Sequence, residues 1–131
     1  MRKICLVCTL ALALAGAECS PYLRLAVIGA KSTLNQADYD GVKIADISCE
    51  NDVLTYKYIF EESQDINWEA ISGENKKDFL SAMKEILVEE FCLDEDTLAL
   101  LQRAKSIIMD YSLPSGSLFG RIKLTAKDCE K

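Results

Sequence analysis

The sequence predicts one α+β domain in which an antiparallel sheet of two hairpins is covered by three helices, in the order α-β-β-α-α-β-β. Three observations predict this fold. Two pairs of segments alternate apolar and polar residues on either side of a turn, as hairpins do. Between these pairs lies a long segment whose apolar residues recur at helical spacing. The length of 131 residues suits a single domain with a single core.

A signal peptide is expected at 1–17, which leaves 18–131 as the domain. Two basic residues precede an apolar run, and small residues follow it up to a cleavage site near Ala17. The run is shorter than the roughly 20 apolar residues of a transmembrane anchor. A lipoprotein acylated on Cys19 is the alternative, but Glu18 stands where such sites have a small residue. The protein is therefore expected in the periplasm or secreted, with no membrane span.

Cleavage makes the chain more acidic. Loss of Arg2 and Lys3 lowers the basic residues from 15 to 13 against 21 acidic residues, so the formal net charge moves from −6 to −8. This balance argues against a nucleic-acid binder, which needs a basic patch. The chain also has no histidine. Catalytic sites of the Ser-His-Asp or Cys-His type, a haem proximal histidine and zinc sites that use histidine are therefore excluded within this chain.

The first element of the domain is predicted to be a helix. Ser20 and Pro21 form a cap and first-turn pair, and apolar residues then recur at helical spacing as far as Leu34. The alternative is a strand, because Tyr22–Ile28 is rich in residues that favour strands.

A hairpin follows this element. Val42–Cys49 is predicted to be a strand with a bulge near Ala45 and Asp46, where the apolar phase shifts. A turn at 51–52 leads into the returning strand Val53–Phe60.

The second half is predicted to hold two helices and a second hairpin. Glu74–Phe91 is the strongest helical pattern in the chain. Asp94 or Asp96 caps a shorter helix. Ile107–Leu113 and Leu118–Leu124 are strands joined by a Pro-Ser-Gly turn. The apolar stripe of the long helix consists of Phe79, Leu80, Met83, Ile86, Leu87 and Phe91.

The mature chain keeps four cysteines, which predict two disulfides, Cys19–Cys49 and Cys92–Cys129. A first helix about 24 Å long and a returning strand about 26 Å long would bring Cys49 beside Cys19. The second pair follows by elimination. A four-thiolate metal site would have to be assembled from four separate elements, without any Cys-x-x-Cys pair. Neither a metal nor a cofactor is therefore predicted.

Several residues together resemble known exported proteins. They are the run Asp38–Val42, the run Leu54–Tyr58, Cys92, Leu98–Leu101, Tyr111, Gly116 and Cys129. With these residues the chain resembles small exported bacterial α/β proteins. It is similar to the quorum-sensing-regulated virulence factor family and to periplasmic immunity proteins that neutralise secreted cell-wall-degrading toxins. The resemblance implies an exported binding protein and brings no catalytic motif.

Two acidic groups are the candidate partner-binding residues. They are Glu61, Glu62 and Asp65 after the second strand, and Glu89 and Glu90 at the end of the long helix. An acidic surface would steer a cationic partner toward the protein. The alternative is a solvated face, with further carboxylates placed where helix starts favour them. The chain shows no isolated carboxylate pair, calcium loop or phosphate loop, so no catalytic residue is predicted.

Trp68 is the single tryptophan and the remaining candidate. As a partner-binding residue it would be an exposed anchor in a pocket of the partner. Alternatively, it packs with Ile66 or Ile71 and seats the long helix. Tyr56 and Tyr58 share one sheet face and are interpreted as core or cross-strand pairs rather than a ligand platform.

These patterns predict an exported binding protein without enzymatic activity. The most concrete form is an inhibitor or immunity-type protein that occludes a cationic toxin or cell-wall hydrolase. The alternative is a secreted virulence-associated factor that acts on host surfaces, and a carboxylate-dependent hydrolase ranks third. The sequence leaves the identity of the partner and the oligomeric state open.

Overall fold

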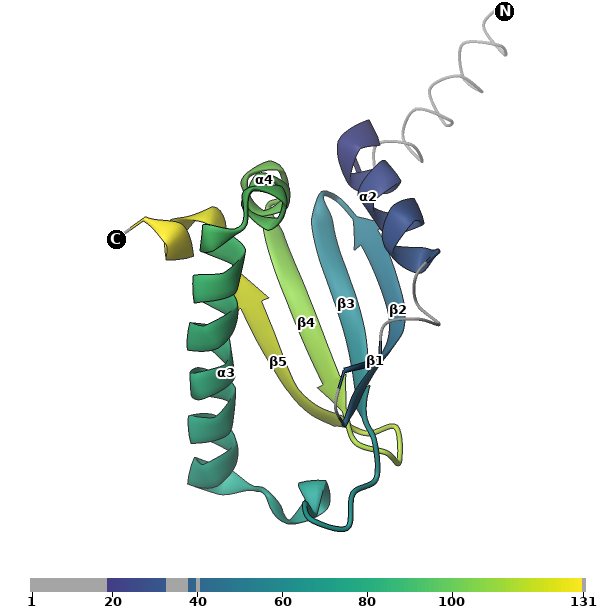
Figure 1. Ribbon diagram of the computed structural model, residues 1–131, viewed down its shortest axis with the longest axis vertical. Helices are drawn as coiled ribbons and strands as arrows, with labels where there is room; N and C mark the ends of the chain where they lie inside the picture. Colours follow the sequence, from purple (N-terminus) through teal and green to yellow (C-terminus); the bar gives the residue numbers. More distant parts are fainter. Residues whose placement is uncertain (1–18, 33–37, 40, 131) are drawn as a thin grey trace, which may run out of the picture.

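The computed structural model describes residues 19–32, 38–39 and 41–130. The predicted signal peptide and the end of the predicted first helix lie outside these residues. The three predicted helices and four predicted strands occur in the predicted order, together with the short elements β1, η1 and η2, which were not predicted (Figure 1). They are α2 (Pro21–Lys31), β1 (Asp38–Tyr39), β2 (Val42–Glu50), β3 (Val53–Phe60), η1 (Trp68–Ala70), α3 (Gly73–Leu93), α4 (Glu95–Arg103), β4 (Ser106–Ser112), β5 (Leu118–Leu124) and η2 (Ala126–Cys129).

The α+β class, the three helices and the two hairpins are confirmed, and the first element is a helix. The sheet order is β1-β2-β3-β4-β5, where β1 is a short edge strand that the sequence did not predict. The prediction of an antiparallel sheet needs one correction, because β3 and β4 pair in parallel. The reason is the connection between them. Helix α3 carries the chain back along the whole sheet, so β4 starts at the same end as β3.

The predicted bulge and the predicted turn of the first hairpin are both present. The register of β2 against β3 shifts between Ile44 and Asp46, which is the predicted bulge. Asn51 and Asp52 have φ values of 52° and 61°, as a tight two-residue hairpin turn requires. The Asp52 carboxylate also accepts a hydrogen bond of 2.8 Å from the backbone N–H of Ser20. This bond holds the start of α2 at the hairpin turn.

Both predicted disulfides are present. Cys19 and Cys49 join the start of α2 to the end of β2, with their Cα atoms 5.9 Å apart. Cys92 and Cys129 join the end of α3 to η2, with their Cα atoms 5.6 Å apart.

The helices lie on one face of the sheet. Leu23 of α2 shares a single core with Leu54, Ile107 and Met109, which point inward from β3 and β4. The other face carries exposed side chains such as Lys57. None of the helices in the described ranges is long and apolar enough to cross a membrane. The fold is therefore a two-layer structure, with the sheet as one layer and the helices as the other.

Candidate functional site

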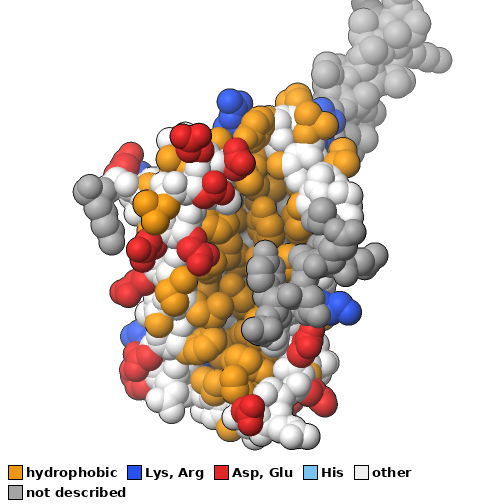
Figure 2. Space-filling model, in the orientation of Figure 1, with side chains coloured by type: hydrophobic (Ala, Val, Ile, Leu, Met, Phe, Trp, Pro, Cys, Tyr) orange, Lys and Arg blue, Asp and Glu red, His pale blue; other side chains and the backbone are white. Residues whose placement is uncertain are grey.

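An apolar groove of about 510 Å³ runs between α3 and the sheet, on the face that carries the helices. We call it the α3 groove. Figure 2 shows apolar side chains exposed in a strip along the middle of this face. The floor consists of Val42, Ile44, Tyr56, Tyr58, Met109 and Tyr111, and the wall consists of Met83, Leu87, Glu90, Phe91, Asp94 and Thr97.

The groove exists because α3 does not cover the middle of the sheet. The main sheet contact of α3 is with the edge strand β5. Gly120 of β5 permits this close approach, since a Cβ atom there would lie 2.5 Å from Leu80 Cδ1. Helix α2 contacts β2 on the other side. Within the described residues, neither helix covers the whole of the inward faces of β3 and β4, which stay partly exposed between α2 and α3.

The floor of the groove is aromatic. Tyr58 stacks on Tyr111 with ring centroids 4.9 Å apart, and Tyr56 continues the row at 6.3 Å from Tyr58. The Tyr111 ring is buried, and this burial raises the pKa of its hydroxyl to about 12. Tyr56 and Tyr58 are half-buried. The floor thus offers flat, uncharged rings to an occupant.

The wall of the groove is the longest helix, yet none of its residues is fully buried. Met83, Leu87 and Phe91 of the predicted stripe line the groove and are only half-buried, and Ile86 of the same stripe, which does not line the groove, is 58% exposed. A surface helix normally buries its apolar stripe against a core. Contiguous exposed apolar surface of this kind marks docking sites for proteins or ligands.

One end of the groove is acidic. Glu90 and Asp94 are exposed at the end of α3, and the Thr97 hydroxyl donates a 3.0 Å hydrogen bond to the Phe91 carbonyl oxygen beside them. Within the described residues, neither carboxylate forms an ion pair or a side-chain hydrogen bond. Figure 2 shows acidic side chains gathered near α4 at this end of the apolar strip.

The predicted acidic residues do not form one surface. Glu61, Glu62 and Asp65 are exposed in the loop after β3, at the foot of the sheet. Glu89 and Glu90 lie near the C-terminal end of α3, which is the opposite end of the molecule. Of these five residues, only Glu90 lines the α3 groove.

Trp68 is not an exposed anchor, and this part of the predicted partner-binding set is corrected. Only 9% of its surface is exposed, and its ring stacks on Phe60 with centroids 4.0 Å apart. Its Nε1–H donates a 3.1 Å hydrogen bond to the Glu61 carbonyl oxygen. The ring also meets Phe79 of α3 edge-on at 5.9 Å, so Trp68 seats the start of the long helix.

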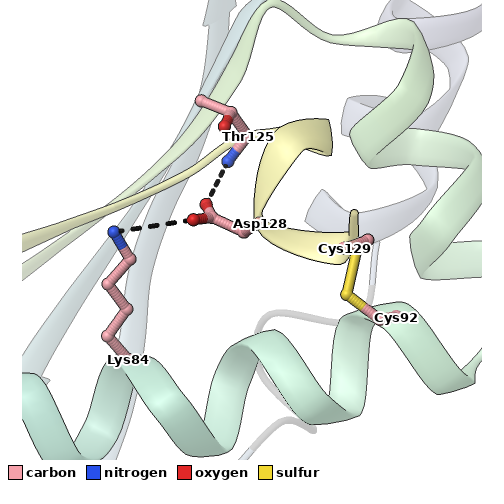
Figure 3. A network of polar contacts seen from close by, with 5 residues as sticks. All are labelled: Lys84, Cys92, Thr125, Asp128 and Cys129. Atoms are coloured by element: carbon pink, nitrogen blue, oxygen red, sulfur yellow. Dashed lines mark hydrogen bonds and ion pairs between the residues drawn. A yellow bond between two sulfur atoms is a disulfide. The ribbon is translucent and has the colours of Figure 1, made fainter. Parts of the chain in front are cut away.

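A second hollow, of about 630 Å³, lies beside the Cys92–Cys129 disulfide, and Glu89 lines it. Figure 3 shows the polar contacts next to this disulfide. Asp128 accepts a 2.8 Å hydrogen bond from the Thr125 backbone N–H and lies 3.9 Å from Lys84 Nζ. These contacts cap η2 and hold it against α3, which is a structural role.

The arrangement of the groove suits binding rather than acid–base chemistry. Its two carboxylates are exposed, and its buried ionisable group, Tyr111, has a pKa of about 12, further from neutral pH than the ordinary value of 10.0. In the part of the chain that is described, no three side chains of the metal-binding types lie together.

Sequence reasoning missed the groove itself. The floor residues Tyr56 and Tyr58 were interpreted as core or cross-strand pairs, and the wall residues Met83, Leu87 and Phe91 were assigned to the apolar stripe of the long helix. The types and spacing of these residues are those of an ordinary core, so the sequence does not indicate which of them stay partly exposed.

No protein-family model and no curated protein match the chain. Among solved structures, it is similar to the pilotin EpsS from the type 2 secretion system of Vibrio vulnificus. That similarity has a TM-score of 0.57 at 18% identity and covers 82% of this chain and 90% of the other. The chain is also similar to the type II secretion system pilotin AspS from Vibrio cholerae. There the TM-score is 0.51 at 16% identity, with 77% and 84% covered.

These comparisons contradict the function predicted from the sequence. The two solved proteins found to share the fold are pilotins of type II secretion systems, not immunity proteins, inhibitors or virulence factors that act on host surfaces. The prediction was wrong because it treated two acidic groups at opposite ends of the molecule as one surface for a cationic toxin or hydrolase. It also used a resemblance carried by fold-forming residues.

Proposed function

We propose that this chain is a bacterial pilotin-type protein of a type II secretion system, and that it holds a helical segment of another component of that system in the α3 groove. The observation that carries the proposal is the uncovered apolar groove on a fold shared with two pilotins. The protein acts by binding and does not catalyse a reaction. Two disulfides and the predicted signal peptide favour a location in the periplasm.

A helix is the occupant that best fits the groove. The wall from Met83 to Asp94 covers twelve residues, which rise by about 16 Å in an α-helix. That length matches about three turns of a second helix, whose apolar residues at i, i+3/i+4 and i+7 would face the floor. The half-buried Leu87, Phe91 and Tyr58 would then become covered from water. Burial of such surface contributes roughly 25 cal/mol per Å² to binding.

Site-specific photocrosslinking in the strain that encodes the chain tests this proposal. A photoreactive phenylalanine at Leu87 faces the groove, whereas one at Lys57 on the open sheet face serves as the matched control. We expect the Leu87 probe to crosslink to a component of the type II secretion system, identified by mass spectrometry, and the Lys57 probe not to. Crosslinks to proteins outside that system, or the same products from both positions, would contradict the proposal.

A further inference from the structure

The two ends of the α3 groove differ in charge. Val42, Tyr58 and Tyr111 line the end near the foot of the sheet, where β3 and β4 finish. Glu90 and Asp94 line the end near α4, about one helical turn apart along the chain. Among the described residues that line the groove, those at one end are uncharged and those at the other end include two carboxylates.

Any occupant that covers this end removes water from the carboxylates of Glu90 and Asp94. In the described part of the chain they have no cationic partner, and water solvates them because they are exposed. Burying an ionised carboxylate without a partner is costly. An occupant with neutral or acidic residues there is therefore disfavoured, and one that brings Lys or Arg is favoured.

The charges also distinguish the two directions in which a helix can lie. The N-terminal end of a helix carries partial positive charge, and its C-terminal end carries partial negative charge. The carboxylates of Glu90 and Asp94 therefore attract an N-terminal end and repel a C-terminal end. Basic side chains in the first turns of the occupant would act in the same direction.

Building on the proposed function, we infer that the α3 groove selects a partner helix with basic residues in its first turns, and that Glu90 and Asp94 orient its N-terminal end toward α4. These two residues determine specificity and direction, whereas the apolar floor supplies contact area. A second copy of this chain fits the groove poorly. Its formal net charge of −6 would bring acidic surface against the acidic rim.

Three synthetic 18-residue peptides test the inference. All share one leucine stripe at helical spacing, an acetylated N-terminus and an amidated C-terminus. One carries two arginines in its first turns, the second carries them in its last turns, and the third has glutamines at all four positions. Fluorescence anisotropy with the full chain at low salt should rank the first peptide tightest, roughly fivefold above the glutamine peptide. High salt should reduce this preference, because it screens exposed charges.

A matched pair of variants tests whether Glu90 and Asp94 cause the preference for arginines in the first turns. In Glu90→Gln/Asp94→Asn the three affinities should converge. In Glu61→Gln/Glu62→Gln, which removes the same charge at the far end of the molecule, the ranking should persist. Equal binding of all three peptides to the unaltered chain, or loss of the ranking in both variants, would overturn the inference and leave the proposed function standing.

Two further outcomes would contradict the binding of a partner helix in the groove, and not only its orientation. If the folded chain binds none of the peptides, the groove does not hold helices, and the proposed function fails together with the inference. If gel filtration gives a dimer that Leu87→Asp converts to a monomer, a second copy occupies the groove and the inference is wrong.

Discussion

Tyr111 is the buried ionisable side chain of the α3 groove, with 3% of its surface exposed. Burial raises its pKa from 10.0 to about 12, because the apolar surroundings disfavour the phenolate. The unfolded chain loses this proton near pH 10, whereas the folded chain holds it up to about pH 12. The contribution of Tyr111 to stability is therefore complete below pH 10 and is lost as the pH rises through 12.

The Tyr111→Phe variant tests this pH dependence, since it keeps a ring against Tyr58 and removes the ionisable hydroxyl. We expect urea unfolding to show a smaller loss of stability between pH 10 and pH 12 in this variant than in the unaltered chain. The matched control is Tyr22→Phe, which removes a tyrosine hydroxyl from an exposed ring on α2, outside the groove. Parallel profiles for Tyr111→Phe and the unaltered chain would show that Tyr111 does not ionise in this range.

At the scale of elements, the sequence predicted those features, such as turns and bulges, that depend on residues close together in the chain. The bulge near Ala45 follows from a phase shift visible in the strand, and the turn at Asn51 and Asp52 uses residue types that tolerate positive φ. The parallel pairing of β3 with β4 was not predicted. Nor was the position of α3 over β5, which depends on a close approach between Leu80 and Gly120, forty residues apart. Such contacts leave no local pattern.

The Cys92–Cys129 disulfide is the element-scale connection between η2 and α3. It closes a loop of 37 residues, for which the chain-entropy model gives about 4 kcal/mol of stabilisation. We expect Cys92→Ser/Cys129→Ser to unfold at lower urea concentration. Hydrogen exchange should also show faster exchange of the Asp128 and Glu130 amides, which bond to carbonyls within this turn.

The other disulfide provides the control for this local effect. Cys19→Ser/Cys49→Ser opens a loop of 30 residues and should lower stability by a similar amount. Because it lies at the start of α2, the protection of Asp128 and Glu130 relative to the core strands should be retained. Unchanged protection of η2 in Cys92→Ser/Cys129→Ser would mean that Thr125, Asp128 and Lys84 hold it without the disulfide.

At the scale of the whole molecule, the groove is a site that only the assembled layers define. Its residue types are ordinary core types, so the sequence analysis selected charged residues as the candidate partner-binding site. Of the five acidic residues in that candidate set, only Glu90 lines the groove. Because the groove is open, apolar side chains of α3 stay partly exposed in the folded chain. Stability and function are therefore separable here, since residues that line the groove contribute less to the core than residues of the same type beneath α4.

Leu87 and Leu101 test this separation. Leu87 is half-buried in the groove wall, whereas Leu101 of α4 is 1% exposed. Leu101→Ala should cost roughly 2–5 kcal/mol of unfolding free energy. Leu87→Asp should cost less, because its carboxylate can reach water, yet it should abolish the fluorescence that the neutral dye Nile red gains on the native chain. Dye binding that survives Leu87→Asp and disappears in Ile59→Asp, on the open sheet face, would place the accessible apolar surface outside the groove.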